Sequence, residues 1–357
     1  MKPVRVAIIG VRRGAAHIEP LRSHEQCEVV AVCDLRAVRA QAVAQRYGID
    51  RVLPDYAAVL SDPQVNAVCI ATPDHLHGEM TVQALQAGKH VLCEIPLATT
   101  LEHCRQILDL SRARNLKVQM GNECRWMPYL QAVKGLIEQG QFGRLFYGEA
   151  EYLHNLLLDG SRVQEENGSR HWRWDPAHPQ TTLLGGGPHA LDTLRWLLGV
   201  DQFQEVVAFG TQGSIDLTPA DDTTVALYRT TDGVLAKITV SYGMHRPYCL
   251  YYSCYGTDGS FEASRDTPQG PGRVFLKSIR HQTGMMELPV PLWQHPRQRA
   301  GVGHGTTEYY QDRDFVDAIL EDRDPLINAR EGAISCAAGI CGLEAARTRQ
   351  RVDIPQF

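Results

Sequence analysis

The first third of the chain alternates short apolar runs with helix-like stretches, and this alternation constrains the fold more than any other feature. The runs are almost continuously apolar, as in strands that are buried on both faces of a parallel sheet. One helix-like stretch ends in Gly88, a residue type that commonly follows a helix C-terminus. Repeated strand–helix–strand units predict a doubly wound α/β domain of the Rossmann type. We expect its strands at Val4 to Gly10, Cys27 to Asp34, Asn66 to Pro73, Lys89 to Pro96 and Lys117 to Glu123.

After about residue 144 the pattern changes to alternating apolar and polar residues, with turn signals such as Asp232-Gly233 between the runs. A period of two is typical of strands with one packed face and one open face. Helix-like stretches surround Asp192 and Asp314. We therefore predict an open, mostly antiparallel sheet flanked by helices, which makes the whole an α/β domain followed by an α+β domain. The predicted boundary divides the chain into residues 1–122 and 123–357.

Length and composition narrow the class of protein. A chain of 357 residues suits two domains, and its formal net charge of -5 gives no reason to expect a nucleic-acid partner. The N-terminal apolar stretch is soon interrupted by Arg12 and Arg13, so it predicts neither a signal peptide nor a membrane span. The ten cysteines include no CxxC pair and match no zinc or disulfide framework. We expect reduced thiols in a cytoplasmic protein, with Cys33, Cys69 and Cys93 packed as small apolar side chains.

The first predicted strand leads into a glycine-containing loop at Gly10 to Gly14. A dinucleotide-binding loop needs glycine where the backbone turns sharply and approaches the pyrophosphate, and the next helix supplies N–H donors. The usual GxGxxG spacing is not intact here. Either Arg12 replaces the second glycine, or one residue is deleted and Gly14 is the third. Arg12 and Arg13 are candidates for phosphate contact, and the alternative is that they are solvated surface residues.

Asp34 ends the second predicted strand, at the position where a dinucleotide-binding domain carries its ribose-binding acid. A carboxylate there accepts both adenosine ribose hydroxyls and repels the 2′-phosphate of NADP. Two like charges about 4 Å apart cost up to about 4 kcal/mol at an effective dielectric near 20. The sequence therefore predicts NAD as the cofactor, although Arg36 and Arg39 are close enough in sequence to weaken this repulsion.

Longer motifs along essentially the whole chain resemble the glucose–fructose oxidoreductase / inositol dehydrogenase / MocA family (Gfo/Idh/MocA). The run ATPDHLH at 71–77 and the run AGKHVLCE at 87–94 are highly specific in combination. Further matching segments are GNECRWMPYLQAVKGLIEQGQFGRL at 121–145, WRW at 172–174, GGGPHALDTLRWLLG at 185–199, YGTDGSFEAS at 255–264 and GHGTTEYYQDRDFVDAI at 303–319.

The resemblance implies a nicotinamide dinucleotide at the edge of the Rossmann sheet and a sugar-like substrate against the sheet of the second domain. Trp172 would approach the substrate, together with Arg173 near the cofactor; the alternative is that these two form a packed cation–π pair. Carried over by position, the further cofactor contacts are Ala71, Thr72, Pro73, His75, His77, Glu94 and Asn122. For His75 and His77 the alternative is a structural or helix-capping role.

Two catalytic signatures of the family are altered in this chain. The family's Glu-Lys-Pro motif reads Glu94-Ile95-Pro96, and isoleucine offers neither a hydrogen-bond donor nor a transferable proton. The family also places an aspartate four residues before a histidine. That position is Gly185 here, while His189 is present. The ordinary dehydrogenase mechanism therefore does not transfer to this chain unchanged.

His189 is the remaining acid–base candidate. Alcohol oxidation needs a base for the hydroxyl proton while a hydride leaves the carbon, and imidazole suits this near neutral pH. Asp192 follows three residues later, where it can face the same cleft and either orient His189 or bind a substrate hydroxyl. The alternative is a buried histidine satisfied by an aspartate. We predict catalytic roles for both residues.

Other polar residues are weaker candidates. His154 ends the first strand of the second domain, and Tyr309 and Tyr310 lie near the C-terminal helix; we predict substrate contacts for His154 and Tyr309. A tyrosine can replace the missing lysine as a donor. His154, His189 and Asp192 carry metal-ligating groups, but no compact HxH or HxxxH pair accompanies them, so we predict no metal.

The sequence leaves three functions open. The first is net oxidation or reduction of a sugar, polyol or inositol. The second is a redox-neutral reaction in which retained NAD transiently oxidises a sugar hydroxyl so that a neighbouring group is eliminated or a centre is epimerised. The third is a non-catalytic NAD- or sugar-binding protein, which Ile95 and Gly185 favour. The open sheet face also predicts a homo-oligomer, either a dimer or a tetramer.

Overall fold

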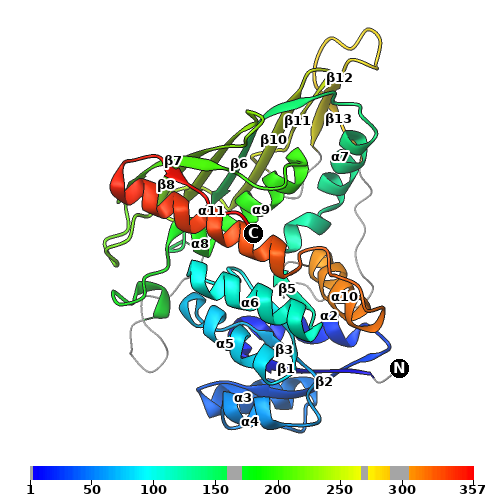
Figure 1. Ribbon diagram of the computed structural model, residues 1–357, viewed down its shortest axis with the longest axis vertical. Coiled ribbons are helices and arrows are strands. Elements are labelled where there is room, and N and C mark those ends of the chain that lie inside the picture. Colours follow the sequence, from blue (N-terminus) through cyan, green and yellow to red (C-terminus); the bar gives the residue numbers. More distant parts are fainter. Residues whose placement is uncertain (1–2, 159–170, 267–271, 290–304) are drawn as a thin grey trace. The chain divides into compact units, whose positions relative to one another are not determined.

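The computed structural model describes residues 3–158, 171–266, 272–289 and 305–357. These residues form two compact units, and three separate stretches of the chain contribute to the first unit (Figure 1). The described part of the first unit runs from residue 3 to Glu123 and from 305 to Cys336, and it includes Phe357. The other described residues form the second unit. A single boundary between residues 122 and 123 therefore does not capture the return of the chain to its first unit.

The first unit contains a five-stranded sheet in the order β2-β1-β3-β4-β5, and every pair of neighbouring strands is parallel. All five strands fall within the runs that the sequence predicted, which confirms the Rossmann-type fold. Their bounds are β1 Val4–Ile9, β2 Cys27–Cys33, β3 Ala67–Ile70, β4 His90–Glu94 and β5 Val118–Gly121.

Helices connect these strands and cover the sheet. The segment after β1 is divided into α1 Val11–Gly14, η1 Ala15–His17 and α2 Ile18–Arg22. The helix before β4 ends as expected, because Gly88 adopts a φ of 76° and its N–H donates to the carbonyl of Leu85. The other helices of this unit are α3 Ala37–Tyr47, α4 Tyr56–Ser61, α5 Asp74–Gln86, α6 Leu101–Arg114 and α10 Thr306–Leu320.

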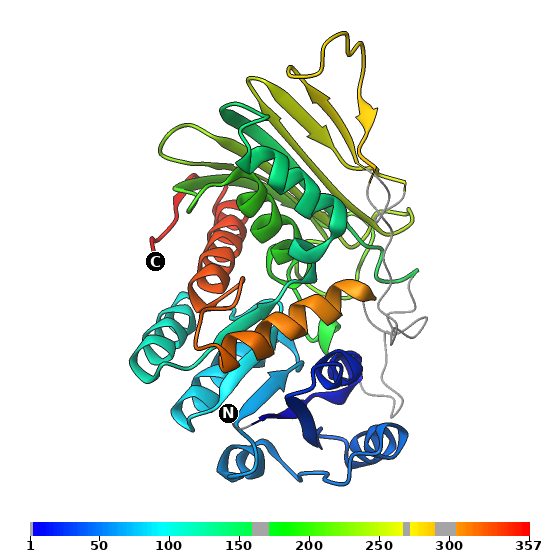
Figure 2. The same cartoon turned by 90° about the vertical axis from the view of Figure 1, so that its right-hand side faces the viewer.

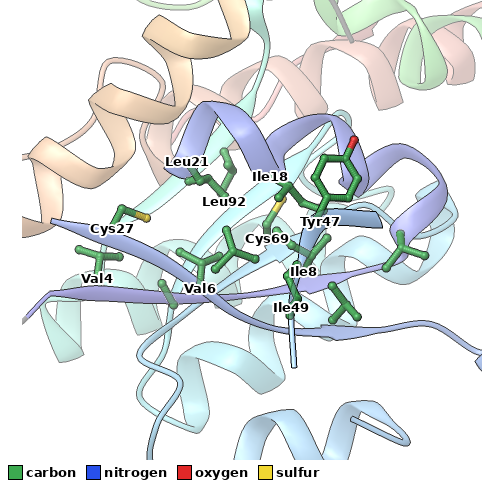
Figure 3. Packing of buried hydrophobic residues seen from close by; sticks show 14 of the residues in the cluster. Val4, Val6, Ile8, Ile18, Leu21, Cys27, Tyr47, Ile49, Cys69 and Leu92 are labelled. Atoms are coloured by element: carbon green, nitrogen blue, oxygen red, sulfur yellow. The ribbon is translucent and has the colours of Figure 1, made fainter. Parts of the chain in front are cut away.

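The core of the first unit lies between the strands and the segment that follows β1. Figure 3 shows Val4, Val6 and Ile8 of β1 gathered with Ile18 and Leu21 of α2. Cys27 on β2 and Cys69 on β3 take part in this packing, as predicted for Cys69. Burial raises the pKa of the Cys69 thiol to about 12, so this side chain stays protonated and apolar near neutral pH.

The second unit contains a nine-stranded sheet in the order β13-β12-β11-β10-β6-β9-β8-β7-β14. Among the described strands of this second sheet only the central pair β6 and β9 is parallel, so the prediction of a mostly antiparallel sheet is confirmed. The strands are β6 Leu145–Leu153, β7 Glu205–Thr211, β8 Thr223–Arg229, β9 Leu235–Ser241, β10 Cys249–Gly256, β11 Gly259–Glu262, β12 Arg273–Leu276, β13 Met286–Glu287 and β14 Val352–Asp353.

One face of this sheet is covered by helices, which Figure 2 shows beside the strands. The helix α9 (Gly187–Leu198) packs on β6, β9 and β10. The remaining helices are α7 Pro128–Glu138, η3 Trp172–Trp174, α8 Thr182–Gly185 and α11 Ala329–Thr348, the last of which begins in the first unit, while η2 Glu123–Trp126 includes the boundary between the units. Among the described residues, no helix has the length and apolar character needed to cross a membrane.

Candidate active site

Gly10 marks the point where β1 turns into the candidate cofactor loop. It adopts a φ of 81°, and a Cβ at this position would lie 2.5 Å from the carbonyl oxygen of Ala71. The glycine is therefore required both by its conformation and by the close approach of β3. Gly14 is required by packing, since a Cβ there would lie 2.6 Å from a methyl group of Ile8. In the GxGxxG motif the third glycine allows the helix to pack closely on the strand. Gly14 has this role here, which favours the interpretation that the loop lacks one residue of the motif.

Asp34 lies directly after β2 and holds the loop from the other side. Its carboxylate accepts hydrogen bonds from the backbone N–H of Val11 at 3.0 Å and of Arg36 at 2.9 Å. The guanidinium of Arg39 lies 4.0 Å away. The predicted ribose acid is thus placed beside the glycine loop with its orientation fixed, while Arg12 is exposed and Arg13 is half-buried.

Ala71, Thr72 and Pro73 connect β3 to α5, as the family resemblance implies. His77 on α5 is buried, and its two ring nitrogens lie 2.8 Å and 2.7 Å from the carbonyl oxygens of Thr72 and Pro96. Burial opposes protonation of this ring, but Cys93, Asp74 and the Pro96 carbonyl raise its pKa to about 10. This geometry favours the structural alternative for His77, in which it joins two loops, while His75, two residues earlier, is half-buried.

Glu94 belongs to a buried ionic network that the sequence did not predict. It pairs with Arg13 at 2.8 Å and with His17 at 2.8 Å. The other ring nitrogen of His17 lies 2.9 Å from Asp312, and Arg13 also pairs with Glu308 at 2.5 Å. Burial alone would lower the pKa of His17, but the carboxylates on both nitrogens raise it well above its usual value.

This network fixes Glu94 at the carboxyl end of β4, where ligands of doubly wound folds bind. Asn122 is fully buried just after β5. Ile95, at the position where the family resemblance implies a lysine, is half-buried. Tyr309 lies on α10, so it belongs to the first unit and not to the second domain as predicted; it is almost completely buried, and its substrate contact stays a prediction.

In the second unit, His189 lies in the first turn of α9 and is fixed on three sides. Its Nδ1 is 3.4 Å from Sγ of Cys124, and its ring stacks on Tyr152 with centroids 5.5 Å apart. The hydroxyl of Tyr252 donates to its backbone carbonyl at 2.8 Å. Burial, with smaller effects from Cys124 and Tyr129, raises the pKa of Tyr252 well above its usual value, so this hydroxyl remains a donor.

Asp192 takes part in a buried ion pair. Its two carboxylate oxygens accept from Nε and NH2 of Arg125 at 2.8 Å and 2.5 Å, and the side chain is fully buried. Arg195 adds a second cation at 3.6 Å. These contacts favour the structural alternative for Asp192, and its part in catalysis stays a prediction.

Two tyrosines fill the space beside the glycine run that precedes His189. A Cβ at Gly186 would lie 2.3 Å from the ring of Tyr152, and a Cβ at Gly185 would lie 2.4 Å from the hydroxyl of Tyr242. The Tyr152 hydroxyl is 2.8 Å from Nδ1 of His154. A tyrosine hydroxyl therefore occupies the place beside residue 185 where the family resemblance implies an aspartate side chain. Sequence reasoning missed Tyr152, although it lies two residues before His154 and so shares its side of the strand.

Trp172 and Arg173 form a cation–π pair, with the guanidinium carbon 4.8 Å from the centre of the indole. The Nε of Arg173 also donates to Gln180 at 2.9 Å. Trp172 and Arg173 therefore form the packed pair that was the alternative interpretation. Their contacts with cofactor and substrate stay predictions.

A Rossmann unit with a glycine loop and a ribose acid, followed by a sheet unit with a fixed histidine, defines a dinucleotide-dependent oxidoreductase. The family model described as "Oxidoreductase family, NAD-binding Rossmann fold" matches residues 4–122. A model for the GFO/IDH/MocA C-terminal domain matches residues 130–262. The chain therefore belongs to the Gfo/Idh/MocA family, as its motifs predicted, and its cofactor is NAD. The positive φ of Gly10 in the turn after β1 and the position of Asp34 beside that turn fit this cofactor.

Individual relatives match along most of the chain. Levoglucosan dehydrogenase of Pseudarthrobacter phenanthrenivorans is 25% identical, over 89% of this chain and 87% of that protein. The 1,5-anhydro-D-fructose reductase of Ensifer adhaerens is 28% identical, over 92% of this chain and 91% of that protein. A solved structure of levoglucosan dehydrogenase in complex with NADH and L-sorbose has the same fold, with a TM-score of 0.87, 24% identity and 100% coverage of both chains.

Proposed function

We propose that this NAD-dependent oxidoreductase acts on a CH–OH group of a sugar, polyol, inositol or glycoside. The observation that carries the proposal is His189, whose ring is held in one orientation inside a cluster of hydroxyl and imidazole groups. Such a cluster is suited to a ligand with several hydroxyl groups. Two relatives support a carbohydrate, because they are named for levoglucosan and for 1,5-anhydro-D-fructose.

In the proposed reaction the first unit binds the dinucleotide through Gly10, Gly14 and Asp34. When bound, NAD supplies the hydride acceptor. His189 takes the proton of the reacting hydroxyl at Nε2 during oxidation and returns it during reduction. Tyr152 and His154 orient neighbouring hydroxyl groups of the substrate, and Glu94 keeps its predicted place near the nicotinamide end of the cofactor.

The experiment that tests this function compares His189→Ala with the wild type on levoglucosan, inositols and 1,5-anhydro sugars. The variant is expected to retain NAD binding and thermal stability while turnover falls at least about 100-fold, the usual scale for a general base. NADH formation is followed by absorbance. Near-normal turnover in His189→Ala would remove the acid–base role, and absence of turnover by the wild type on every carbohydrate would remove the substrate class.

A redox-neutral reaction is the second candidate, and the Tyr152–His154 pair favours it. Elimination or epimerisation next to a transient ketone needs a second proton acceptor besides the one that serves the hydroxyl. The Tyr152 hydroxyl can accept the carbon-bound proton while its own proton passes to Nδ1 of His154, 2.8 Å away. Solvent deuterium at the carbon next to the oxidised centre, without accumulation of NADH, distinguishes this reaction from net oxidation.

We also propose that the protein forms a homo-oligomer through the open face of the second sheet. Val207 and Phe209 of β7 pair in register with Leu227 and Val225 of β8, and all four are exposed. A contiguous apolar patch of this kind is typical of an interaction surface. Light scattering should give a dimer or tetramer that Phe209→Lys dissociates; a monomeric wild type would contradict this.

We further propose a cytoplasmic location for the protein. The ten buried free cysteines support it, because thiols stay reduced in that compartment.

A further inference from the structure

We propose that Cys104 and Cys336 of the first unit are a redox-sensitive modification site, which a peroxide converts into a reversible disulfide. Cys104 lies near the start of α6 and Cys336 lies on α11, and both side chains are fully buried. The two thiols lie within hydrogen-bonding reach of each other. This inference goes beyond the proposed function, because the pair is separate from the groups that we assign to the reaction.

The segment between β4 and α6 holds Cys336 in place. The backbone N–H of Ala98 donates to Sγ of Cys336 at 3.4 Å. Gly332 lies one turn earlier on α11, and a Cβ there would lie 2.7 Å from the side chain of Leu97. Because residues four apart share one face of a helix, this face of α11 packs closely on Leu97 and Ala98. Cys104 follows this segment at the start of α6, so one short stretch of chain contacts the Cys336 sulfur at two points.

The surroundings of Cys336 favour its thiolate, which is the reactive form of a cysteine. Burial opposes ionisation of the Cys336 thiol, but hydrogen bonds from Cys104 and from two backbone N–H groups lower its pKa below the ordinary value. The charge of His77 acts in the same direction. By contrast, burial raises the pKa of the Cys254 thiol to about 12. A peroxide should therefore oxidise the Cys104–Cys336 pair before an ordinary buried thiol of this chain.

The reaction needs an oxidant, and burial of both sulfurs limits this oxidant to a molecule as small as a peroxide. One thiolate attacks a peroxide oxygen, so that a sulfur–oxygen bond forms, the oxygen–oxygen bond breaks and the departing hydroxide takes up a proton. The second thiol then attacks the sulfenic sulfur, and a second water leaves as the disulfide forms. In total the thiols lose two protons and two electrons, and the peroxide becomes two waters. The disulfide is the same whichever sulfur reacts first.

The disulfide should act on the loop that carries Glu94. Two sulfurs must approach to about 2 Å to form a bond, so the Cys336 sulfur moves toward Cys104 and away from the N–H of Ala98. Ala98 lies only a few residues after Glu94, which has its predicted place near the nicotinamide end of the cofactor. We therefore expect the oxidised protein to bind NAD more weakly than the reduced protein.

The test exposes the reduced full-length protein to hydrogen peroxide, denatures it with an alkylating reagent present and maps its peptides by mass spectrometry. The expected product has one disulfide between the peptides of Cys104 and Cys336, which dithiothreitol reduces. Cys104→Ser and Cys336→Ser should not form it, whereas Cys254→Ser, which removes another buried thiol, should form it like the wild type. A wild type in which both cysteines stay alkylated, or are oxidised only to sulfinic acid, would overturn the proposal, even if a variant does not fold.

Calorimetric titration with NAD measures the effect on the loop. The oxidised wild type should bind NAD at least about fivefold more weakly than the reduced protein, which is the lower end of the usual coupling between two sites. By reciprocity, saturating NAD should favour the reduced dithiol by the same factor. Peroxide should leave the NAD affinity of Cys104→Ser unchanged, and equal affinities of the oxidised and reduced wild type would refute the coupling. Neither measurement uses a carbohydrate, so a failure of the proposed function is recognised separately, by absence of turnover.

Discussion

The hydroxyl of Tyr242 lies 2.4 Å from the point where a Cβ would stand on Gly185. The same hydroxyl donates to the carbonyl of Thr181 at 3.1 Å, so it is held in this place by the backbone of the preceding turn. An aspartate at residue 185, which the family resemblance implies, would therefore compete with the tyrosine at residue 242 for one volume.

This competition predicts the cost of adding a side chain at residue 185. Gly185→Ala should lower the free energy of unfolding by about 1–3 kcal/mol, the usual cost of overpacking. Tyr242→Phe removes the nearest atom, so the double variant should lose less stability than the sum of the two single variants. Urea denaturation followed by circular dichroism measures these differences.

The matched control is Gly135→Ala, because a Cβ on that helical glycine meets no atom within 4 Å. It should be neutral or stabilising, since alanine favours the helix. Additive losses in the Gly185 and Tyr242 double variant would show that the two residues do not share a volume.

The fold could be predicted because its main elements have strong local signals. Each parallel strand is an unbroken apolar run, and the strands of the second unit alternate with a period of two. The return of α10 to the first unit could not be predicted in this way. Its helical pattern was visible around Asp314, but the contacts of Phe315 and Val316 with the core of the first unit link residues far apart in the sequence.

The sequence indicated those residues of the candidate site whose own chemistry identifies them. It did not indicate residues whose role depends on a contact with another residue. Gly10 and Asp34 follow from the geometry that any dinucleotide imposes. His17 was missed because its importance lies in two carboxylates, Glu94 and Asp312, that reach it from distant strands and helices. The ion pair of Asp192 was missed for the same reason, since its partner Arg125 lies 67 residues earlier in the chain.

The position of Asp34 predicts the preference between the two dinucleotides. Asp34→Asn keeps an oxygen for the Val11 N–H but removes the charge that repels a 2′-phosphate, so the ratio of NADP to NAD affinity should rise at least about tenfold. Asp34→Ala also removes the contact with the loop and should weaken the binding of both. Calorimetric titration measures the affinities. Tighter binding of NADP than of NAD by the wild type would contradict the role of Asp34.

The ionic network around His17 predicts how stability depends on pH. The pKa of His17 is raised well above its usual value by Asp312 and Glu94, against the effect of burial. A group with a raised folded pKa stabilises the protein fully below its unfolded pKa, about 6.5 for histidine, and this stabilisation is lost as the pH rises through the folded value. The melting temperature of the wild type should therefore fall as the pH rises above about 6.5.

The control for this prediction is the double variant His17→Gln with Asp312→Asn, in which neither residue of the pair can ionise. Its melting temperature should fall less steeply over the same range, because His17 no longer contributes. His77 has a pKa raised to about 10 and is present in both proteins, so its effect cancels in the comparison. Parallel curves for the two proteins between pH 6.5 and 10, within about 1 °C, would show that His17 is not charged in the native state.

The last prediction concerns the Tyr152 hydroxyl, which is 2.8 Å from Nδ1 of His154. Tyr152→Phe keeps the ring that stacks on His189 and fills the space beside Gly186, and it removes only the hydroxyl group. If this hydroxyl orients the substrate or relays a proton to His154, turnover should fall at least about tenfold while the melting temperature changes little. Initial rates with carbohydrate substrates and thermal melts measure the two quantities.

Tyr248→Phe is the matched control, because the Tyr248 ring packs edge-on against His154 with centroids 5.0 Å apart. Removal of this second hydroxyl from the same cluster should change turnover by less than about threefold. Equal losses in the two variants would mean that the cluster acts only by packing. Reactions in deuterated water then divide the two candidate functions. If Tyr152 accepts a carbon-bound proton, the wild type introduces solvent deuterium into the product and Tyr152→Phe does not, whereas a plain dehydrogenase forms NADH without deuterium in either protein.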